Sequence, residues 1–184
     1  MLLATDIDDV LLPTFAAFLQ FHNDQYGSSL RLEDITQYQF DSYMGVDHEE
    51  GERRIRGFHN SEYFAHLTPY AGAAPVLEEL AGKHEIIAIS GRNFGMGQST
   101  QDWMKQYFPF VRNTYLTNHF GGGRPKVELC QELGVELFIE DAPVHADLCR
   151  AAGIPVILLD QPWNQSSNGV PRAYGWQGEK SMAA

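Results

Sequence analysis

The chain has 184 residues, of which 43% are hydrophobic and 12% aromatic, so it can bury the core of one domain with a small insertion, and disorder is not the default expectation. Its formal net charge of −11 argues against a protein that binds polymeric nucleic acid, because such proteins need a basic surface. No apolar run approaches the length of a membrane span and the N-terminus lacks a basic leader, so we expect no membrane partner.

The first predicted element is a buried strand over Leu2–Ile7 that runs into a cluster of acids. Side chains alternate along a strand, so Asp6 and Asp8 are expected to point the same way while Ile7 enters the core. Two carboxylates about 5 Å apart repel by roughly 3 kcal/mol at an effective dielectric constant of about 20. A divalent cation removes this repulsion, and magnesium suits the pair because it keeps positions free for water and phosphate oxygens. The alternative is a solvated turn in which Asp9 caps the next helix.

Residues 13–71 differ from the rest of the chain and are rich in Phe and Tyr. Helical patterns cover Thr14–Tyr26 and Asp47–His59. An insertion directly after the first strand lies over the carboxyl end of that strand, where open α/β sheets bind ligands. We therefore expect a helical cap that excludes water and selects the substrate, with most of its aromatic side chains forming the cap's own core.

Strands and helices alternate through the remainder of the chain. Further strands are predicted over Glu85–Ser90, Asn113–Leu116, Val135–Glu140 and Pro155–Leu159, and helices over Ala74–Lys83, Ser99–Phe108, Lys126–Leu133 and Val144–Ala152. This alternation predicts an α/β fold, a three-layer Rossmann-like parallel sheet with helices on both faces and a small helical cap after the first strand. The expected core comprises residues 1–12 and 72–163. A C-terminal tail follows at 164–184, anchored to the sheet edge by Trp163, Tyr174 and Trp176.

The cysteines and histidines carry no metal-binding pattern. Cys130 and Cys149 are two thiols in a chain without a signal peptide, which predicts a reducing compartment, the cytoplasm. The seven histidines lack metal-ligand spacing and are expected to be surface or cap residues. Of these, His145 follows Asp141 closely enough to touch a site at that strand end.

Three other positions at strand and helix ends carry groups that suit a phosphate ester. Ser90 and Gly91 follow the second strand and offer a hydroxyl and exposed backbone N–H groups to a phosphate oxygen. Lys126 lies in the first turn of a helix, where the helix dipole repels a cation, so we expect it to face an anion or a carboxylate. A later strand ends in Glu140 and Asp141, again acids after a buried run.

Together these groups form the set that phosphoryl transfer through an aspartyl-phosphate requires. One carboxylate attacks phosphorus, and magnesium holds it next to a phosphate oxygen. A second acid protonates the leaving oxygen and later activates water. A lysine and a serine bind the charge that develops on the phosphoryl group. The sequence therefore predicts a magnesium-dependent phosphomonoesterase whose substrate is a small phosphorylated metabolite.

The segment Asp6-Ile7-Asp8-Asp9-Val10, with Ser90, Lys126 and Glu140-Asp141, resembles the four ordered motifs of the haloacid dehalogenase superfamily of phosphatases over residues 1–163. This resemblance implies that Asp6 is the nucleophile and Asp8 the general acid/base. It implies that Ser90, with Gly91 beside it, and Lys126 bind the phosphoryl group. It also implies that magnesium is bound by Asp6, Asp141 and Asp8, the last through its backbone carbonyl, with Glu140 near it.

The short cap, the Ile139-Glu140-Asp141 ending and the late Asp160-Gln161-Pro162-Trp163-Asn164 are similar to the 5'(3')-deoxyribonucleotidase-like branch, which implies a (deoxy)nucleoside monophosphate as substrate. Two positions depart from the usual motifs: Asp9 replaces a small residue, and Ser90-Gly91-Arg92-Asn93 replaces a Thr-Ser or Thr-Ala start. Arg92 is either a second anion-binding residue or a solvated one. The alternative function is a non-catalytic or regulatory phosphate-binding protein on a related α/β scaffold. Against it, receiver domains lack a long insertion after the first strand and a second acid near the first.

Overall fold

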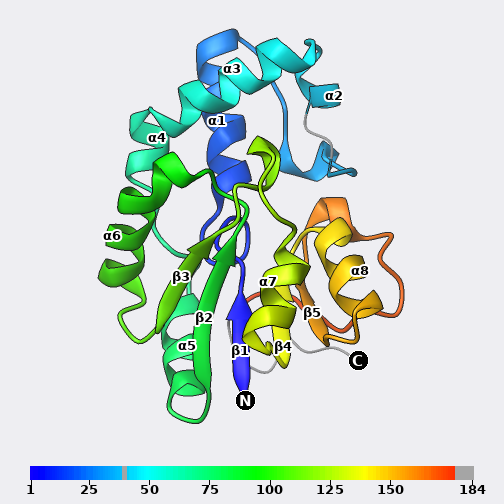
Figure 1. Cartoon of the computed structure of the whole chain (residues 1–184). Helices are drawn as coiled ribbons and strands as arrows, with labels where there is room; N and C mark the ends of the chain where they lie inside the picture. The colour runs from blue at the N-terminus through cyan, green and yellow to red at the C-terminus, as the bar shows by residue number, and fades with distance from the viewer. Residues whose placement is uncertain (39–40, 177–184) are drawn as a thin grey trace.

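The computed structural model of the protein describes residues 1–38 and 41–176, and it places a six-stranded parallel sheet at the centre (Figure 1). The strands are β1 (Leu2–Thr5), β2 (Glu85–Ser90), β3 (Asn113–Leu116), β4 (Leu137–Glu140), β5 (Val156–Leu159) and β6 (Arg172–Ala173), in the order β3-β2-β1-β4-β5-β6. The chain moves outward from β1 to β3 and then returns to the other side of β1 as β4. This reversal creates a switch point between β1 and β4, where parallel sheets place their ligand sites.

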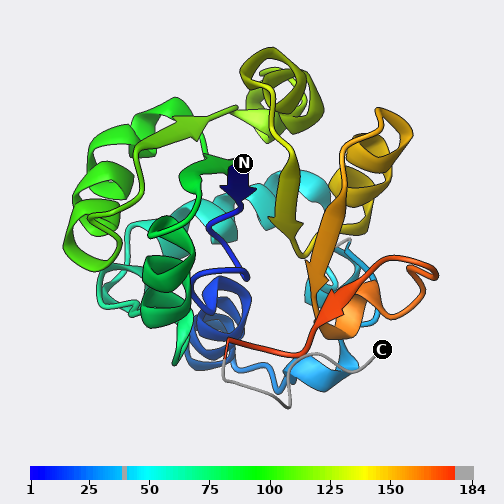
Figure 2. The ribbon, with the colours of Figure 1, turned by 90° about the horizontal axis from the view of Figure 1, so that it is seen from below.

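Helices cover both faces of the sheet, as the three-layer prediction requires (Figure 2). On one face lie α5 (Ala73–Ala81) and α6 (Gly97–Tyr107), and on the other α7 (Lys126–Leu133) and α8 (Pro143–Ala151). Side chains along β1 alternate between the two helical layers. Leu3 packs with α5 and α6 on one face of the sheet, and Ala4 packs with α7 and α8 on the other. The α/β fold class predicted from the sequence is confirmed.

The helices between β1 and α5, which fall within the predicted cap segment (residues 13–71), lie above the carboxyl ends of the strands (Figure 1). The segment contains α1 (Thr14–Tyr26), α2 (Asp41–Met44), α3 (His48–His59) and α4 (Glu62–Ala65). Its interior is a separate aromatic cluster in which Phe58 contacts Phe18 and Phe21 at ring-centroid distances of 5.6 and 5.8 Å. As expected, many of the aromatic residues of this segment form its own core.

The part of the tail that the structure describes packs against the core. Residues 172–173 add β6 to the edge of the sheet beside β5, a strand too short to predict from its sequence. Trp163 and Trp176 are buried, and Trp176 donates a hydrogen bond of 2.7 Å to the carbonyl oxygen of Val10. The expectation was wrong for Tyr174, whose side chain is exposed. The last residues of the predicted tail, 177–184, lie outside the described residues.

The bounds of the predicted elements agree with the structure to within two residues, and the difference that bears on the site is at the first strand. That strand ends at Thr5 rather than Ile7, because the carbonyl of Ile7 accepts the N–H of Leu11 at 2.8 Å and the chain turns. Asp9 takes a positive φ of 56° within this turn. The turn still directs Ile7 into the core and keeps the acids at the sheet edge. In the parts of the chain that the structure covers, every helix is too short or too polar to traverse a lipid bilayer.

Candidate active site

The carboxylate of Asp6 lies directly after β1 and faces Lys126, the first residue of α7. The Lys126 ammonium lies 2.6 Å from Asp6 Oδ2 and donates a hydrogen bond of 2.9 Å to Glu140 Oε2 at the end of β4. All three side chains are buried. Burial by itself lowers the pKa of Lys126, but the two carboxylates outweigh it and raise the pKa above its ordinary value. The sequence predicted an anion or a carboxylate beside Lys126, and the structure places two carboxylates there, those of Asp6 and Glu140.

The Glu140 carboxylate accepts hydrogen bonds from three donors. Its Oε1 accepts hydrogen bonds of 3.1 Å from the backbone N–H groups of Asp141 and Ala142, while its Oε2 accepts from Lys126. Burial alone raises the pKa of Glu140, but Lys126 and these donors bring it below its ordinary value. Glu140 therefore stays ionised and holds the lysine in place.

Three carboxylates crowd this edge of the sheet and suit a hard cation. Asp6, Glu140 and Asp141 each offer an oxygen, and these atoms lie within 4.8 Å of one another. Burial raises the pKa of Asp6 and of Asp141, and the neighbouring carboxylates add to it. Because one ammonium offsets only one of the three charges, a divalent cation would relieve the remaining repulsion. Asp6 and Asp141 are the residues that fit this role.

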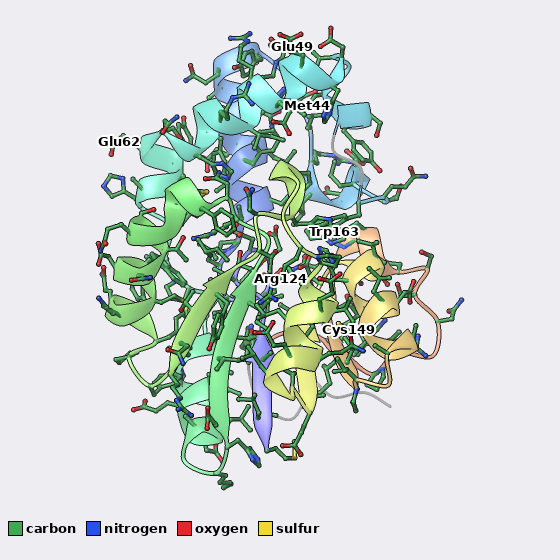
Figure 3. All side chains as sticks on the ribbon, viewed as in Figure 1. Met44, Glu49, Glu62, Arg124, Cys149 and Trp163 are labelled. Atoms are coloured by element: carbon green, nitrogen blue, oxygen red, sulfur yellow. The ribbon has the colours of Figure 1, made fainter. Side chains whose placement is uncertain are left out.

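Asp141 is oriented by the segment that follows β5. Trp163 Nε1 donates a hydrogen bond of 2.9 Å to Asp141 Oδ2, and Asn164 Nδ2 donates one of 2.9 Å to the Asp141 carbonyl oxygen. Trp163, labelled in Figure 3, lies where the core meets the cap segment, with its ring 5.4 Å from that of Phe15. This support joins the acid cluster to the start of α1.

Ser90 and Gly91 reach the same site from the end of β2. A methyl group built on Gly91 would lie 3.9 Å from Lys126 Cε and 3.6 Å from His119 Cβ, so the backbone here passes close to the lysine. The Ser90 hydroxyl accepts the N–H of Arg92 at 3.2 Å. Gly91 thus lies beside Lys126, with Ser90 directly before it in the chain, and the phosphoryl-binding role of the three residues stays a prediction.

Asp8 points toward a different group of side chains. Its Oδ1 accepts from Thr14 Oγ1 at 2.6 Å and from Arg92 Nη2 at 2.7 Å, and its Oδ2 accepts from Arg92 Nε at 2.8 Å. Burial opposes ionisation of Asp8, but Arg92 and Thr14 outweigh it and lower the pKa to about 2. The Asp8 carboxylate lies outside the acid cluster, so its part in metal binding, through the backbone carbonyl, stays a prediction.

Asp9 explains the departure from the usual first motif. Its Oδ1 accepts the N–H of Phe15 at 2.9 Å, so it caps the start of α1, as the alternative interpretation proposed. Asp9 is buried rather than solvated, and Gln161 Nε2 donates a hydrogen bond of 2.8 Å to the Asp9 carbonyl oxygen. Asp9 therefore anchors the cap segment to the core beside the acids.

Two residues near the site have an environment that the sequence did not predict. Arg92 is not solvated, since its side chain is only 5% exposed and its partner is Asp8. His145 is buried instead of lying at the surface, with its ring 4.7 Å from that of His119, and burial lowers its pKa to about 4. Only the position of His145 four residues after Asp141 pointed to this place.

The fold is that of the haloacid dehalogenase-like hydrolases. A hydrolase of that family from Streptococcus pneumoniae, SP0104, shares the fold with a TM-score of 0.69, over 93% of this chain and 91% of its own, at 12% identity. The chain belongs to the family described as 5' nucleotidase, deoxy (pyrimidine), cytosolic type C protein, whose model matches residues 1–184. The protein is thus a phosphoric monoester hydrolase, which sets aside the regulatory alternative.

Similar proteins from two bacteria carry related names. BH1399 of Halalkalibacterium halodurans, provisionally named a nucleotidase, is 30% identical over 162 residues, 87% of this chain and 80% of that protein. A protein of Clostridium acetobutylicum named 5'(3')-deoxyribonucleotidase is 24% identical over 180 residues, 98% of this chain and 93% of that protein. The resemblance to the deoxyribonucleotidase branch found in the sequence is therefore confirmed at the level of the family.

Replacing Asp141 with Asn should stabilise the metal-free protein and remove its response to magnesium. The raised pKa of Asp141 means that its ionised form destabilises the fold above the ordinary pKa of an Asp, near 4. Asn lacks this charge, so in EDTA at pH 7.5 we expect the Asp141→Asn variant to unfold a few degrees above the wild type. For a protein of this size, about 1 kcal/mol of stability corresponds to about 2–4 °C in unfolding temperature. Scanning calorimetry with and without magnesium measures both effects.

The pH dependence of this difference has a definite sign. Because burial and the neighbouring carboxylates raise the pKa of Asp141 in the folded state, the cost of its charge falls as the pH is lowered toward the ordinary pKa of an Asp, near 4, so the difference in unfolding temperature between variant and wild type should shrink. Histidines with a lowered pKa make both proteins less stable as the pH falls, which is the opposite effect. They are the same in variant and wild type, so their effect cancels in the difference between the two unfolding temperatures. These histidines are His22, His59 and His145. A gap that widens as the pH falls would contradict this account of Asp141.

Proposed function

We propose that the protein is a magnesium-dependent phosphomonoesterase that hydrolyses a (deoxy)nucleoside monophosphate through an aspartyl-phosphate on Asp6. The observation that supports this most directly is the convergence of Asp6, Lys126 and Asp141. The lysine lies 2.6 Å from Asp6, and Asp6 and Asp141 offer oxygens within 4.8 Å of each other. Lys126, together with a cation held by Asp6 and Asp141, could hold one phosphoryl group beside the Asp6 carboxylate, which is the arrangement that phosphoryl transfer needs.

In the first half-reaction, the Asp6 carboxylate attacks phosphorus and the ester oxygen leaves. Lys126 donates to a phosphoryl oxygen, and the backbone around Gly91 and the Ser90 hydroxyl contribute further donors to the charge that develops there. Magnesium, held by Asp6 and Asp141, would supply charge neutralisation. Glu140 keeps the ammonium of Lys126 aimed at Asp6 throughout.

Asp8 is proposed to move the proton in both half-reactions. It would deliver a proton to the leaving oxygen and then accept one from the water that attacks the aspartyl-phosphate. Since Arg92 keeps the pKa of Asp8 at about 2, the free enzyme carries it ionised. The proton must then arrive with the substrate, as the ester monoanion, which a phosphate group with a second pKa of about 6 supplies below neutrality.

The cap segment is proposed to choose the ester, because its helices lie over the strand ends where the leaving group must sit (Figure 1). The family and the relatives named as nucleotidases favour a nucleoside monophosphate over other small phosphate esters. The cytoplasm remains the predicted location, from the two free and buried thiols.

Phosphate release from a panel of deoxynucleoside and ribonucleoside monophosphates tests this proposal. We expect turnover of at least one 5'- or 3'-monophosphate in magnesium, and loss of that turnover in EDTA that added magnesium restores. Sugar phosphates and p-nitrophenyl phosphate in the same assay separate a general phosphatase from a nucleotidase. Equal activity in EDTA and in magnesium would contradict the metal requirement. Activity on sugar phosphates alone would contradict the substrate class.

A further inference from the structure

The buried guanidinium of Arg92 contacts three other parts of the molecule: the segment after β1, helix α6 and helix α4. Its Nε and Nη2 donate to the two oxygens of Asp8 at 2.8 and 2.7 Å, and its Nη1 donates to Thr100 Oγ1 on α6 at 3.1 Å. Its backbone N–H donates to the Ser90 hydroxyl at 3.2 Å. The residue that follows the predicted phosphate-binding Ser90-Gly91 pair therefore contacts the predicted proton-transfer acid directly.

The cap segment covers this ion pair. The guanidinium carbon of Arg92 lies 5.1 Å from the centre of the Phe64 ring on α4, within the range of a cation–π contact. The Phe64 ring in turn lies edge-on to His59, at the end of α3, with 5.0 Å between the ring centres. Arg92 thus contacts both the cap segment and the acid beneath it.

The contacts leave the Asp8 carboxylate little freedom. Two parallel N–H donors from one planar guanidinium fix both the position and the plane of a carboxylate, and a lysine cannot reproduce this geometry. Thr14 adds a third donor from the first residue of α1, at 2.6 Å. Proton transfer requires the acid within hydrogen-bond reach of the departing oxygen, so a carboxylate held in one orientation is already prepared for that step.

We propose that Arg92 is the positioning residue for Asp8, and that through Phe64 it links the orientation of this acid to the cap. The inference rests on the proposed function of Asp8 as the group that protonates the leaving oxygen. It assigns Arg92 a role in leaving-group departure rather than in holding the substrate's phosphate, which Lys126 and the Ser90-Gly91 backbone serve. It also gives a reason for the Ser-Gly-Arg sequence that departs from the usual second motif.

A positioning role predicts that the effect of losing Arg92 depends on the leaving group. A nucleoside monophosphate releases a sugar alkoxide, which needs a proton in the transition state, whereas p-nitrophenolate leaves without one. The quantity kcat/KM covers the steps up to departure of the leaving group and excludes the later attack of water on the aspartyl-phosphate. Comparing kcat/KM for the two esters therefore isolates the step that the Asp8 proton assists.

The test uses the full chain carrying Arg92→Gln, with Arg92→Lys as the conservative variant. For the best nucleoside monophosphate we expect Arg92→Gln to lower kcat/KM by about 100-fold, at the lower end of what general acid catalysis contributes. For p-nitrophenyl phosphate the loss should be roughly threefold or less, since no proton is required. Arg92→Lys should fall between wild type and Arg92→Gln for the nucleotide, because it keeps the charge but loses the bidentate geometry.

Two further variants separate positioning from a general structural effect. In an Asp8→Asn background, Arg92→Gln should cause no additional loss, because the group that Arg92 positions has already been removed. Arg112→Ala serves as the matched control, since Arg112 forms an exposed ion pair with Glu85 at the start of β2, the opposite end of the strand from the site. That variant should hydrolyse both esters at the wild-type ratio.

Equal losses for the two esters in Arg92→Gln and Arg92→Lys would overturn the inference and make Arg92 a phosphate-binding or structural residue. So would a further loss in the Asp8→Asn background. Inactivity of the wild-type protein toward both esters would instead overturn the proposed function, and this inference with it. An active wild type with no leaving-group dependence in the variants overturns the inference alone.

Discussion

Replacing Asp6 with Asn should abolish turnover while the protein stays folded. The amide is a poor nucleophile of nearly the same shape, so no aspartyl-phosphate forms, and we expect kcat to fall by about 10⁴-fold or more. The raised pKa of Asp6 shows that its ionised form is unfavourable in the folded state. Asn removes that charge, so the metal-free variant should unfold at or above the wild-type temperature. Phosphate release and scanning calorimetry measure the two effects.

A chemical label distinguishes loss of the nucleophile from loss of substrate binding. Acid-quenched wild-type enzyme should retain phosphate from a ³²P-labelled ester on Asp6, and Asp6→Asn should retain none. Asp102→Asn on α6 makes the same chemical change at an exposed carboxylate, whose partner is Gln98, and should leave kcat unchanged. Retention of more than about a hundredth of the wild-type kcat by Asp6→Asn would mean that another group attacks phosphorus.

Local patterns in the sequence were sufficient to predict the sheet edge and most of its side chains. Alternation of strands and helices fixes a parallel sheet, and parallel strands bring their carboxyl ends together. A lysine in a first helical turn opposes the helix dipole, so Lys126 was expected to face an anion or a carboxylate, with a solvated lysine as the alternative. The carboxylates of Asp6 and Glu140 provide that partner.

Contacts between distant segments were not predictable in the same way. Arg92 and Asp8 are 84 positions apart, and whether an arginine after a strand turns inward depends on the cap that covers it. The support of Asp141 by Trp163 and Asn164 depends likewise on how the segment after β5 packs. Two adjacent acids can also have different partners. Glu140 accepts a hydrogen bond from Lys126 and Asp141 accepts one from Trp163, and the sequence alone does not show which acid has which partner.

Replacing Lys126 with Met should cost both stability and activity. Met fills a similar volume, but it leaves Asp6 and Glu140 buried with no cation between them. Breaking a buried ion pair from one side costs about 3–5 kcal/mol, and at about 2–4 °C per kcal/mol the unfolding temperature in EDTA should fall by roughly 10 °C. Loss of one donor to the phosphoryl group should lower kcat by about 10²–10³-fold.

The double variant Lys126→Met/Glu140→Gln separates these two consequences. Removing the second charge relieves the repulsion with Asp6, so at least half of the lost stability should return, while kcat stays low because no ammonium faces the phosphoryl group. Lys105→Met, an exposed lysine on α6, controls for the substitution itself and should change neither quantity. Recovery of kcat in the double variant would show that Lys126 serves only to neutralise Glu140. An unchanged unfolding temperature in Lys126→Met would show instead that water or a bound cation already screens the carboxylates around it.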